Sequence, residues 1–173
     1  MNTVEIIKYS LGSAFDILGQ VTADLTQEQA DWMPAGIANP IGALYWHTIS
    51  GADEVVNGWC RGQAPLHQKD GWREKVLTVS VPEPEQGGDY LAYMRAIRVN
   101  VPTLHEYART VAEATQGWLA SLTPEDLERE LETPIGKLNV AQMLETFVIW
   151  HVNAHCGEIS ALKGCQGVKG YPF

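Results

Sequence analysis

Two histidines near the C-terminal end of the sequence, His151 and His155, have the spacing of a pair of metal ligands. They lie in an apolar segment, residues 150–159. If this segment is helical, side chains four residues apart leave the same face one turn apart, so both imidazoles can reach one ion. A third histidine, His47, lies in an earlier apolar segment. The chemistry of the protein depends on whether these three histidines meet.

A single histidine on an apolar helix face is usually an ordinary core residue that is hydrogen-bonded to its neighbours. Three such histidines are harder to explain in this way, because each neutral imidazole has one donor and one acceptor to satisfy. Three nitrogen ligands favour zinc, nickel, copper or ferrous iron over calcium and magnesium, which prefer oxygen. They also leave positions on the ion open for water, a thiol or a substrate, which is the pattern of a catalytic site.

Two neighbours of the histidine pair have more than one interpretation. Glu158 follows His151 by seven residues and therefore shares its helix face. It is either a surface residue in a salt bridge, or a general base or hydrogen-bond acceptor for a metal ligand. Cys156 points about 100° away from His155 on an ideal helix. We therefore expect Cys156 to fill the core as a small apolar residue and not to bind metal.

Four further polar residues are less strongly indicated as members of the histidine site. Asp53 and Glu54 follow His47 by six and seven residues, and such acidic residues are mostly solvated. His67 and His105 are expected to be exposed, the first in a long loop and the second beside the main apolar stripe of its helix. His67 would approach the site only if its loop folds over it.

The apolar residues recur every three or four positions in four segments, which predicts four long helices. These segments span about residues 2–25, 39–62, 89–122 and 139–164. Asn39 is expected to cap the second helix, with Pro40 as its first residue. Pro102 is expected to kink the third helix without ending it. On the last helix the predicted core-facing stripe includes His151 and His155.

The connections between these helices are short, with one exception. Residues 63–88 form the longest irregular stretch, and a loop of this length often covers a cavity or carries function. A short extended piece is expected within it, between residues 74 and 81, and residues 132–138 are expected to form a loop. The sequence therefore predicts an all-α fold, a four-helix bundle with a long loop between the second and third helices, as one domain spanning residues 1–173.

The two halves of the chain share a short pattern. Residues 25–28 (Leu-Thr-Gln-Glu) follow the first helix as residues 122–125 (Leu-Thr-Pro-Glu) follow the third. Trp46-His47 then lies in the second helix, as Trp150-His151 lies in the fourth. If the pattern reflects a duplication, the second and fourth helices occupy equivalent places and present their histidines to a shared interior.

Composition excludes several classes of function. The chain has 173 residues, 45% of them hydrophobic and 19% charged, and a net charge of −9. The acidic balance argues against binding to nucleic acid and to anionic membranes. No apolar run approaches the roughly 18 residues needed to cross a bilayer, and the N-terminus has no signal-peptide pattern. We expect a cytoplasmic protein, whose three cysteines form no disulfide framework.

Three stretches carry a resemblance to a known family. The first comprises residues 31–34, 39–42 and 45–47, at the entry to the second helix; the second comprises residues 138–144, at the start of the last helix. The third is His151-x3-His155-Cys156-Gly157-Glu158-Ile159, with Gly167 and Pro172 in the tail. Together they resemble the DinB/YfiT-like superfamily of metal-dependent four-helix-bundle proteins.

The resemblance implies a metal held by His47, His151 and His155, usually nickel or zinc. It also implies homodimers and a thiol-dependent transferase or isomerase activity on a small molecule, because some relatives use low-molecular-weight thiols such as bacillithiol or mycothiol. Glu158 stands where many relatives carry glutamine, which leaves its role open. Membership of a family does not fix the substrate.

Three functions therefore remain open. The first is a metalloenzyme in thiol-dependent transfer or isomerisation, with zinc or nickel, or iron as a further option. The second is a metal-dependent hydrolase that uses bound water, with Glu158 as its base. The third is a non-catalytic module, either a metal-stabilised dimer or a small-ligand sensor.

Overall fold

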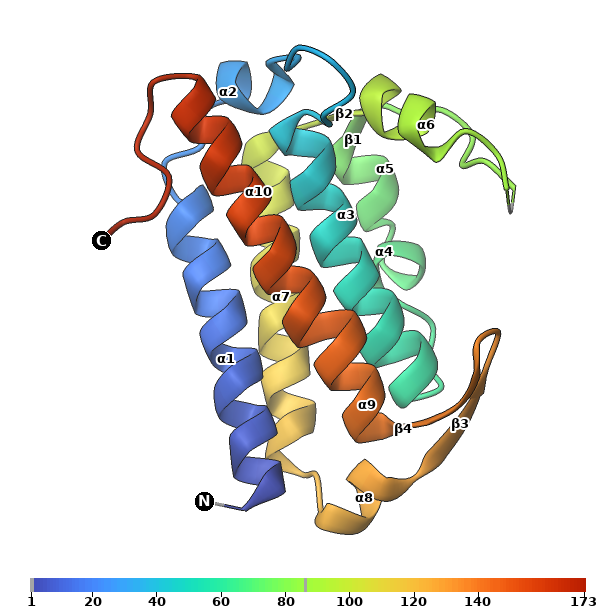
Figure 1. The fold of residues 1–173 in the computed structure, drawn as a ribbon. Helices are drawn as coiled ribbons and strands as arrows, with labels where there is room; N and C mark the ends of the chain where they lie inside the picture. The colour runs from blue at the N-terminus through green and yellow to red at the C-terminus, as the bar shows by residue number, and fades with distance from the viewer. Residues whose placement is uncertain (1, 86) are drawn as a thin grey trace.

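The computed structural model describes residues 2–85 and 87–173. Its longest helices are α1 (Thr3–Thr22), α3 (Ile41–Asp53), α7 (Val101–Ala120) and α10 (His151–Cys165). Figure 1 shows these helices packed side by side as a bundle, in which α1 and α10 run in one direction and α3 and α7 in the other. The predicted all-α four-helix bundle is confirmed.

Local sequence signals explain where several helices begin. Asn2 caps α1 through a capping box, because its side chain accepts from the Glu5 N–H and the Glu5 carboxylate accepts from the Asn2 N–H. Thr26 caps α2 (Gln27–Asp31) in the same way, and Thr123 caps α8 (Pro124–Glu128). Asn139 caps α9 (Val140–Leu144). The repeated pattern after the first and third long helices is therefore a repeated helix start.

Two of the long helices change their winding along their length. The π-helical segment η1 (Glu54–Cys60) continues α3, and η2 (Glu145–Trp150) joins α9 to α10. Each π turn places one extra residue in a helical turn, and such turns are frequent at functional sites.

The predicted cap at Asn39 is wrong by one residue: Pro40 holds the cap position and α3 begins at Ile41 without a side-chain cap.

The predicted third helix is broken, not kinked. Residues before the break form α6 (Tyr90–Ala96), a two-residue strand β2 (Arg98–Val99) follows, and α7 begins at Val101. Pro102 lies in the first turn of α7, where its missing N–H costs nothing. The Asn100 N–H donates to the Val76 carbonyl at 2.8 Å. This hydrogen bond to a distant residue takes the place of the one that the Asn100 N–H would donate to the preceding turn in a continuous helix.

The long connection between α3 and α7 is more ordered than predicted. It contains α4 (Leu66–Lys69), α5 (Trp72–Val76) and the strand β1 (Leu77–Val79), which confirms the expected extended piece. β1 pairs antiparallel with β2, with Leu77 opposite Val99. Figure 1 shows this connection lying along the outer side of α3. Of the predicted loop 63–88, residue 86 lies outside the described residues.

The predicted loop at residues 132–138 is instead a β-hairpin. Its strands are β3 (Glu130–Thr133) and β4 (Gly136–Asn139), which pair antiparallel from Glu130–Asn139 to Thr133–Gly136. Gly136 has a φ of 114°, a conformation that side chains disfavour, so the turn depends on this glycine. The alternation along these short strands is too brief to be distinguished from a loop in the sequence.

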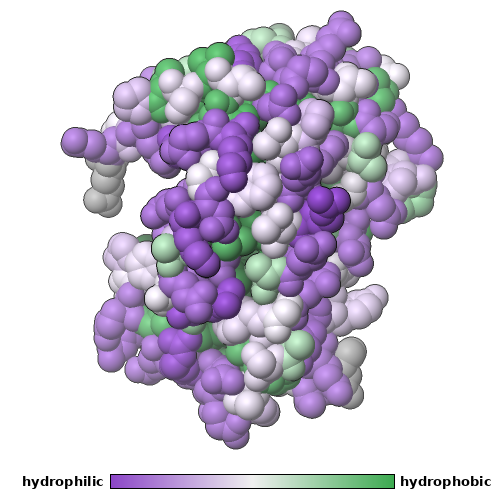
Figure 2. All heavy atoms as spheres, turned by 180° about the vertical axis from the view of Figure 1, so that it is seen from behind, coloured by the Kyte–Doolittle hydropathy of each residue, from purple (hydrophilic) through white to green (hydrophobic). Residues whose placement is uncertain are grey.

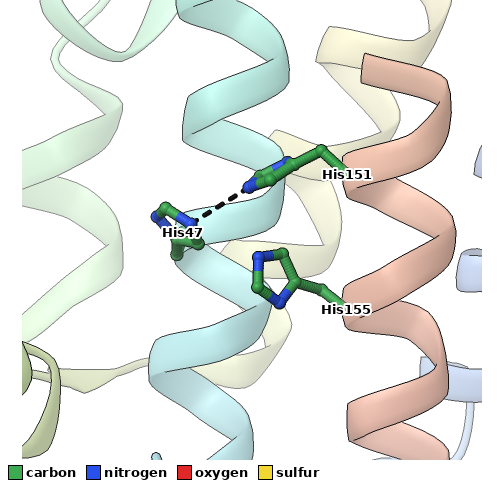
Figure 3. A group of neighbouring side chains, drawn as sticks. All are labelled: His47, His151 and His155. Atoms are coloured by element: carbon green, nitrogen blue, oxygen red, sulfur yellow. Dashed lines mark hydrogen bonds between the residues drawn. The ribbon is translucent and has the colours of Figure 1, made fainter. Parts of the chain in front are cut away.

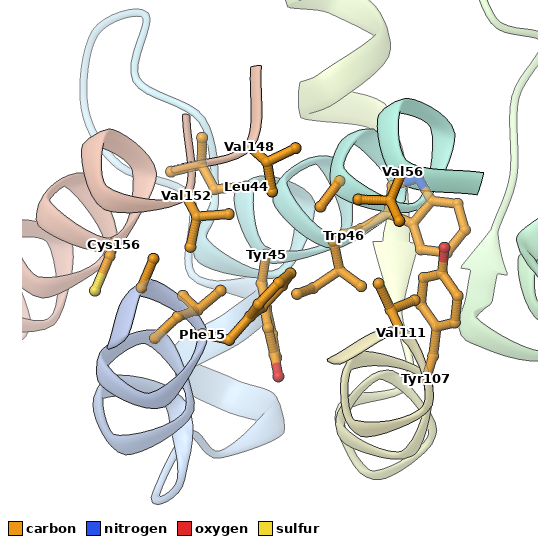
Figure 4. Close-up of a cluster of buried hydrophobic side chains, with 14 of the residues drawn as sticks. Phe15, Leu44, Tyr45, Trp46, Val56, Tyr107, Val111, Val148, Val152 and Cys156 are labelled. Atoms are coloured by element: carbon orange, nitrogen blue, oxygen red, sulfur yellow. The ribbon is translucent and has the colours of Figure 1, made fainter. Parts of the chain in front are cut away.

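The core lies between the four long helices. Figure 4 shows aromatic and branched side chains from all of them meeting there, among them Phe15, Trp46, Tyr107 and Val152. Among the tryptophans, Trp46 is buried, whereas Trp59 and Trp150 are exposed. All three cysteines are free, as predicted.

The surface of the molecule is largely polar. Figure 2 shows hydrophilic residues over most of one face, with small apolar areas between them.

Lys163 of α10 is buried and donates to the Val21 carbonyl at 2.8 Å and to Asp24. The position of α10 beside α1 is therefore fixed by a charged hydrogen bond as well as by packing. None of the described helices combines the length and apolarity that crossing a membrane requires.

Replacement of Asn100 by alanine tests the break before α7. The Asn100 side chain accepts from the Thr103 N–H at 3.0 Å and from the Thr103 hydroxyl at 2.7 Å. Loss of such a cap costs about 1 kcal/mol of the free energy of unfolding. Asn100→Ala should lower the free energy of unfolding by that amount, measured as a lower urea midpoint at unchanged slope, whereas Asn100→Asp should keep the wild-type midpoint. Equal midpoints for Asn100→Ala and the wild type would contradict a helix start at this residue.

Candidate metal centre

The three histidines predicted to bind metal meet in the structure. His47 comes from α3, and His151 and His155 come from the first turns of α10. Figure 3 shows the three rings pointing toward one another. The Nε2 atoms of His47 and His151 are 3.0 Å apart, and one nitrogen of each histidine lies within 4.8 Å of the other two. The arrangement is compatible with metal binding.

The close approach of α3 and α10 brings these rings together. Gly51 lies one turn after His47 on α3, and a Cβ atom built on it would be 3.2 Å from Cε1 of His151. The His151 ring therefore lies directly against the α3 backbone, in space that a larger residue would fill. Gly51 is part of the site, although nothing in the sequence separates it from other helical glycines.

The two closest histidines are held neutral. Burial, together with the neighbouring imidazoles, lowers the pKa of His47 and of His151 to about 4. A neutral imidazole has a free lone pair on one ring nitrogen, and only that form binds a metal. At neutral pH these side chains are therefore already in the protonation state that ligation requires.

The remaining ring nitrogens point away from the centre. Nδ1 of His47 lies 2.9 Å from the Tyr90 hydroxyl, and Nδ1 of His155 lies 2.7 Å from Oε2 of Glu158. A ligating histidine generally gives its second N–H to such an acceptor, which fixes the ring and its tautomer. Nδ1 of His151 is buried and has no hydrogen-bond partner among the described residues.

The histidines lie at the edge of the apolar stripe and not in its middle, which corrects the predicted face of the last helix. The fully buried positions are Val148, Val152, Cys156 and Ile159, while His151 and His155 are only partly buried. The π-helical segment η2, which directly precedes His151, changes the residue spacing on which the predicted stripe was based. Cys156 fills the core, as predicted.

A cavity of about 310 Å³ lies beside His47. Its lining comes from α3, η1 and the long connection, and it is mainly polar. It consists of Trp46, His47, Ser50, Gly51, Glu54, His67, Gln68, Arg73, Glu83, Tyr90 and Tyr93. The segment 63–88 therefore contributes to the surroundings of the histidine cluster, and Glu158 does not line this cavity.

Three residues that we expected to be exposed are buried or shielded. Asp53 is fully buried, His67 has only 11% of its side chain exposed, and His105 is partly buried. His105 binds the Thr22 carbonyl through Nε2 at 3.0 Å, at the end of α1. Asp53 and His67 contact each other. Glu54 is partly exposed, with 44% of its side chain accessible.

Tyr90 and Arg73 lie beside His47 although neither was among the predicted site residues. The Tyr90 hydroxyl, at the start of α6, contacts His47. Arg73 lines the cavity, donates to the Tyr93 hydroxyl at 3.3 Å and pairs with Glu83 at 3.3 Å. Both residues reach the site through the fold of the long connection, and no local pattern in the sequence indicates that.

Comparison with known proteins agrees with the fold. A crystal structure of a conserved protein from Enterococcus faecalis has a TM-score of 0.79 at 19% identity, over 94% of this chain and 96% of that one. A DinB-like protein from Bacillus subtilis has a TM-score of 0.65 at 19% identity, over 96% of both chains. At this identity the likeness shows the fold alone. No functionally curated protein matches the sequence.

The family is shown by the sequence itself. Residues 12–159 match the family model of the DinB superfamily, and this range includes His47, His151, His155 and Glu158. The match covers most of the chain and spans α3, which carries the first histidine, and the part of α10 that carries the other two. The protein belongs to the DinB superfamily.

Proposed function

We propose that His47, His151 and His155 bind one divalent transition-metal ion, and that the protein is a metalloenzyme in thiol-dependent group transfer or isomerisation. The observation that carries the proposal is the convergence of one ring nitrogen from each of three histidines, on two helices, within 4.8 Å. Two of the three rings also have outward partners of the kind that metal-ligating histidines use.

The spacing of the nitrogens fits an ion. Two imidazole nitrogens bound to one zinc ion at about 2.0–2.1 Å in tetrahedral geometry lie about 3.3 Å apart. The Nε2 atoms of His47 and His151 are 3.0 Å apart, close to this separation, and the nitrogens of all three histidines lie within 4.8 Å of one another, so the rings would have to adjust to reach one ion. Nitrogen ligands favour zinc or nickel, with iron as a further option.

The donor set leaves the site open. Within the part of the chain that the structure describes, no cysteine or carboxylate joins the three histidines as a fourth ligand. When bound, the ion supplies Lewis acidity, which favours ionisation of a thiol or a water molecule at the open position. The polar cavity beside His47 offers room for a small substrate, and Tyr90 holds His47 from its other side.

The position of Glu158 supports a role as a positioning residue and not as a base. Its carboxylate contacts Nδ1 of His155, on the side of the ring that faces away from the other histidines. The side chain is 55% exposed and lines a separate surface pocket with Leu44 and Leu162. A hydrolase that uses Glu158 as its base is therefore the weaker alternative.

A panel of low-molecular-weight thiols and carbon electrophiles tests the proposed activity. In the expected reaction the sulfur forms a bond to carbon, the leaving group departs with its electron pair, and the thiol proton is released. We expect the metal-loaded protein to consume thiol, and the metal-stripped protein to be at least about 100-fold slower, since the ion supplies the ionisation. Turnover that does not change when metal is removed would contradict the proposal.

With esters added, the same panel distinguishes thiol-dependent transfer from hydrolysis that uses Glu158 as the base. Glu158→Gln should keep turnover within a few-fold, because the glutamine carbonyl can accept the same hydrogen bond from His155. Ester hydrolysis that is lost in Glu158→Gln would favour the hydrolase in which Glu158 is the base.

Replacement of Gly51 by alanine tests the geometry of the site. The added Cβ would lie 3.2 Å from the His151 ring, so the ring must move by a few tenths of an ångström. We expect metal affinity to fall about tenfold, in line with other changes to residues that orient ligands. Isothermal titration with zinc and with nickel would measure it.

Gly12→Ala provides the matched control. Gly12 is a helical glycine of α1 with nothing within 4 Å of a built Cβ, so its replacement adds helix propensity alone. Metal affinity should equal that of the wild type in Gly12→Ala. An unchanged affinity in Gly51→Ala as well would show that the close packing of His151 on α3 is not needed for binding.

A further inference from the structure

The last residue of α3, Asp53, is a fully buried carboxylate surrounded by hydrogen-bond donors. The Tyr107 hydroxyl donates to it at 2.7 Å, and the Asn57 side-chain amide donates at 2.6 Å. The backbone N–H groups of Leu66 and His67 donate at 3.0 and 2.9 Å. The ring of His67 makes a fifth contact, with Nδ1 at 3.1 Å from Oδ2.

These contacts keep Asp53 ionised. Burial alone would raise the pKa of Asp53, but the hydrogen bonds from His67, Tyr107 and Asn57 outweigh it and lower the pKa. Burial and the charge of Asp53 raise the pKa of Tyr107, so its hydroxyl remains a donor. An ionised carboxylate only accepts hydrogen bonds, so Nδ1 of His67 carries a proton, and the lone pair of a neutral imidazole in this orientation is on Nε2.

The surroundings of His67 hold this ring in place and leave Nε2 available. The ring packs edge-on against Trp46, with centroids 6.3 Å apart. Nε2 lies 3.4 Å from the Gln68 side-chain nitrogen, a long hydrogen bond, and 3.8 Å from a carboxylate oxygen of Glu54. The histidine is therefore oriented by one carboxylate and faces a second one, which can stabilise the protonated ring.

His67 and His47 line the same cavity of about 310 Å³. The cavity also contains the Ser50 hydroxyl, the hydroxyls of Tyr90 and Tyr93 and the Arg73 guanidinium. This lining fits a small polar molecule. The cavity thus joins a proposed metal ligand to an imidazole whose orientation and tautomer are set by a buried carboxylate.

We infer that His67 is a further catalytic residue, a general base for a small polar molecule bound in this cavity, and that Asp53 is its positioning residue. The inference rests on the proposed function. Nε2 takes the proton of a thiol or water nucleophile, and the electron pair of that bond stays on the nucleophile, which bonds to the electrophilic carbon. The leaving group departs with its electron pair, and the imidazolium between Asp53 and Glu54 then gives it the proton.

A purely structural role makes a different prediction. Asp53 could serve only to fasten residues 65–67 to α3 through the two backbone N–H groups that it accepts. In that case the Nε2 atom of His67 would have no special reactivity. Loss of the His67 ring would then alter stability alone.

The reactivity of Nε2 can be measured without knowledge of the substrate. Diethylpyrocarbonate modifies unprotonated imidazole nitrogens, and peptide mapping by mass spectrometry locates the modified residue. On the metal-loaded protein we expect His67 to react at least about tenfold faster than His105, whose Nε2 is bonded to the Thr22 carbonyl. His67 that reacts no faster than His105 would overturn the inference.

Turnover tests the catalytic role directly, with the thiol and electrophile panel as probe. His67→Ala should lower kcat by about 100-fold or more, the range of general base catalysis, at unchanged metal content. Added imidazole should restore part of the loss, which a structural role would not allow. His105→Ala, outside the cavity, should behave as the wild type.

Two outcomes separate this inference from the proposed function. Equal turnover in His67→Ala and the wild type, or a loss that imidazole does not restore, would overturn the role of His67 and leave the metal site intact. If the metal-loaded wild type turns over no member of the panel, the proposed function fails, and the diethylpyrocarbonate comparison alone decides on His67.

Discussion

The histidine cluster depends on how closely α3 and α10 approach each other at Gly51. A glycine at this point lets the His151 ring lie against the α3 backbone, 3.2 Å from where a Cβ would be. His47, one turn earlier on α3, then meets His151 at 3.0 Å between Nε2 atoms. Lys163 donates a hydrogen bond from the C-terminal end of α10 to the C-terminal end of α1. The position of α10 is therefore fixed at its C-terminal end by Lys163 and near its N-terminal end by the contact of His151 with α3. Helix packing, more than any local motif, forms the site.

Placing neutral imidazoles in a partly buried cluster has a cost that the surroundings offset. Burial lowers the pKa of His47 and His151 to about 4, which keeps their lone pairs free near neutral pH. Tyr90 and Glu158 contact the outward Nδ1 atoms of two of the rings. Asp53 orders a fourth imidazole, His67, in the neighbouring cavity by the same means. The region thus combines several oriented imidazoles with a polar cavity, a combination suited to proton transfer.

Features that depend on residues close together in the sequence could be predicted, whereas features that depend on contacts between distant residues could not. The capping boxes at Asn2, Thr26 and Thr123 involve residues three apart, so the helix starts that they make could be predicted. The proximity of His151 and His155 could be predicted because both lie on one helix, four residues apart. The break before α7 could not, since it depends on the bond from Asn100 to Val76 and on strand pairing. The burial of Asp53 was missed for the same reason: its partner Tyr107 lies 54 residues away.

The central claim is that the three histidines form one metal site. Elemental analysis of protein made without a histidine tag tests it most directly, because a tag supplies ligands of its own. We predict about one zinc or nickel ion per chain in the wild type, and less than about a tenth of that in a His47→Ala, His151→Ala double variant that remains folded. These figures follow from the loss of two of three ligands. A wild-type protein without transition metal after expression in metal-supplemented medium, or a double variant with undiminished metal content, would contradict the claim.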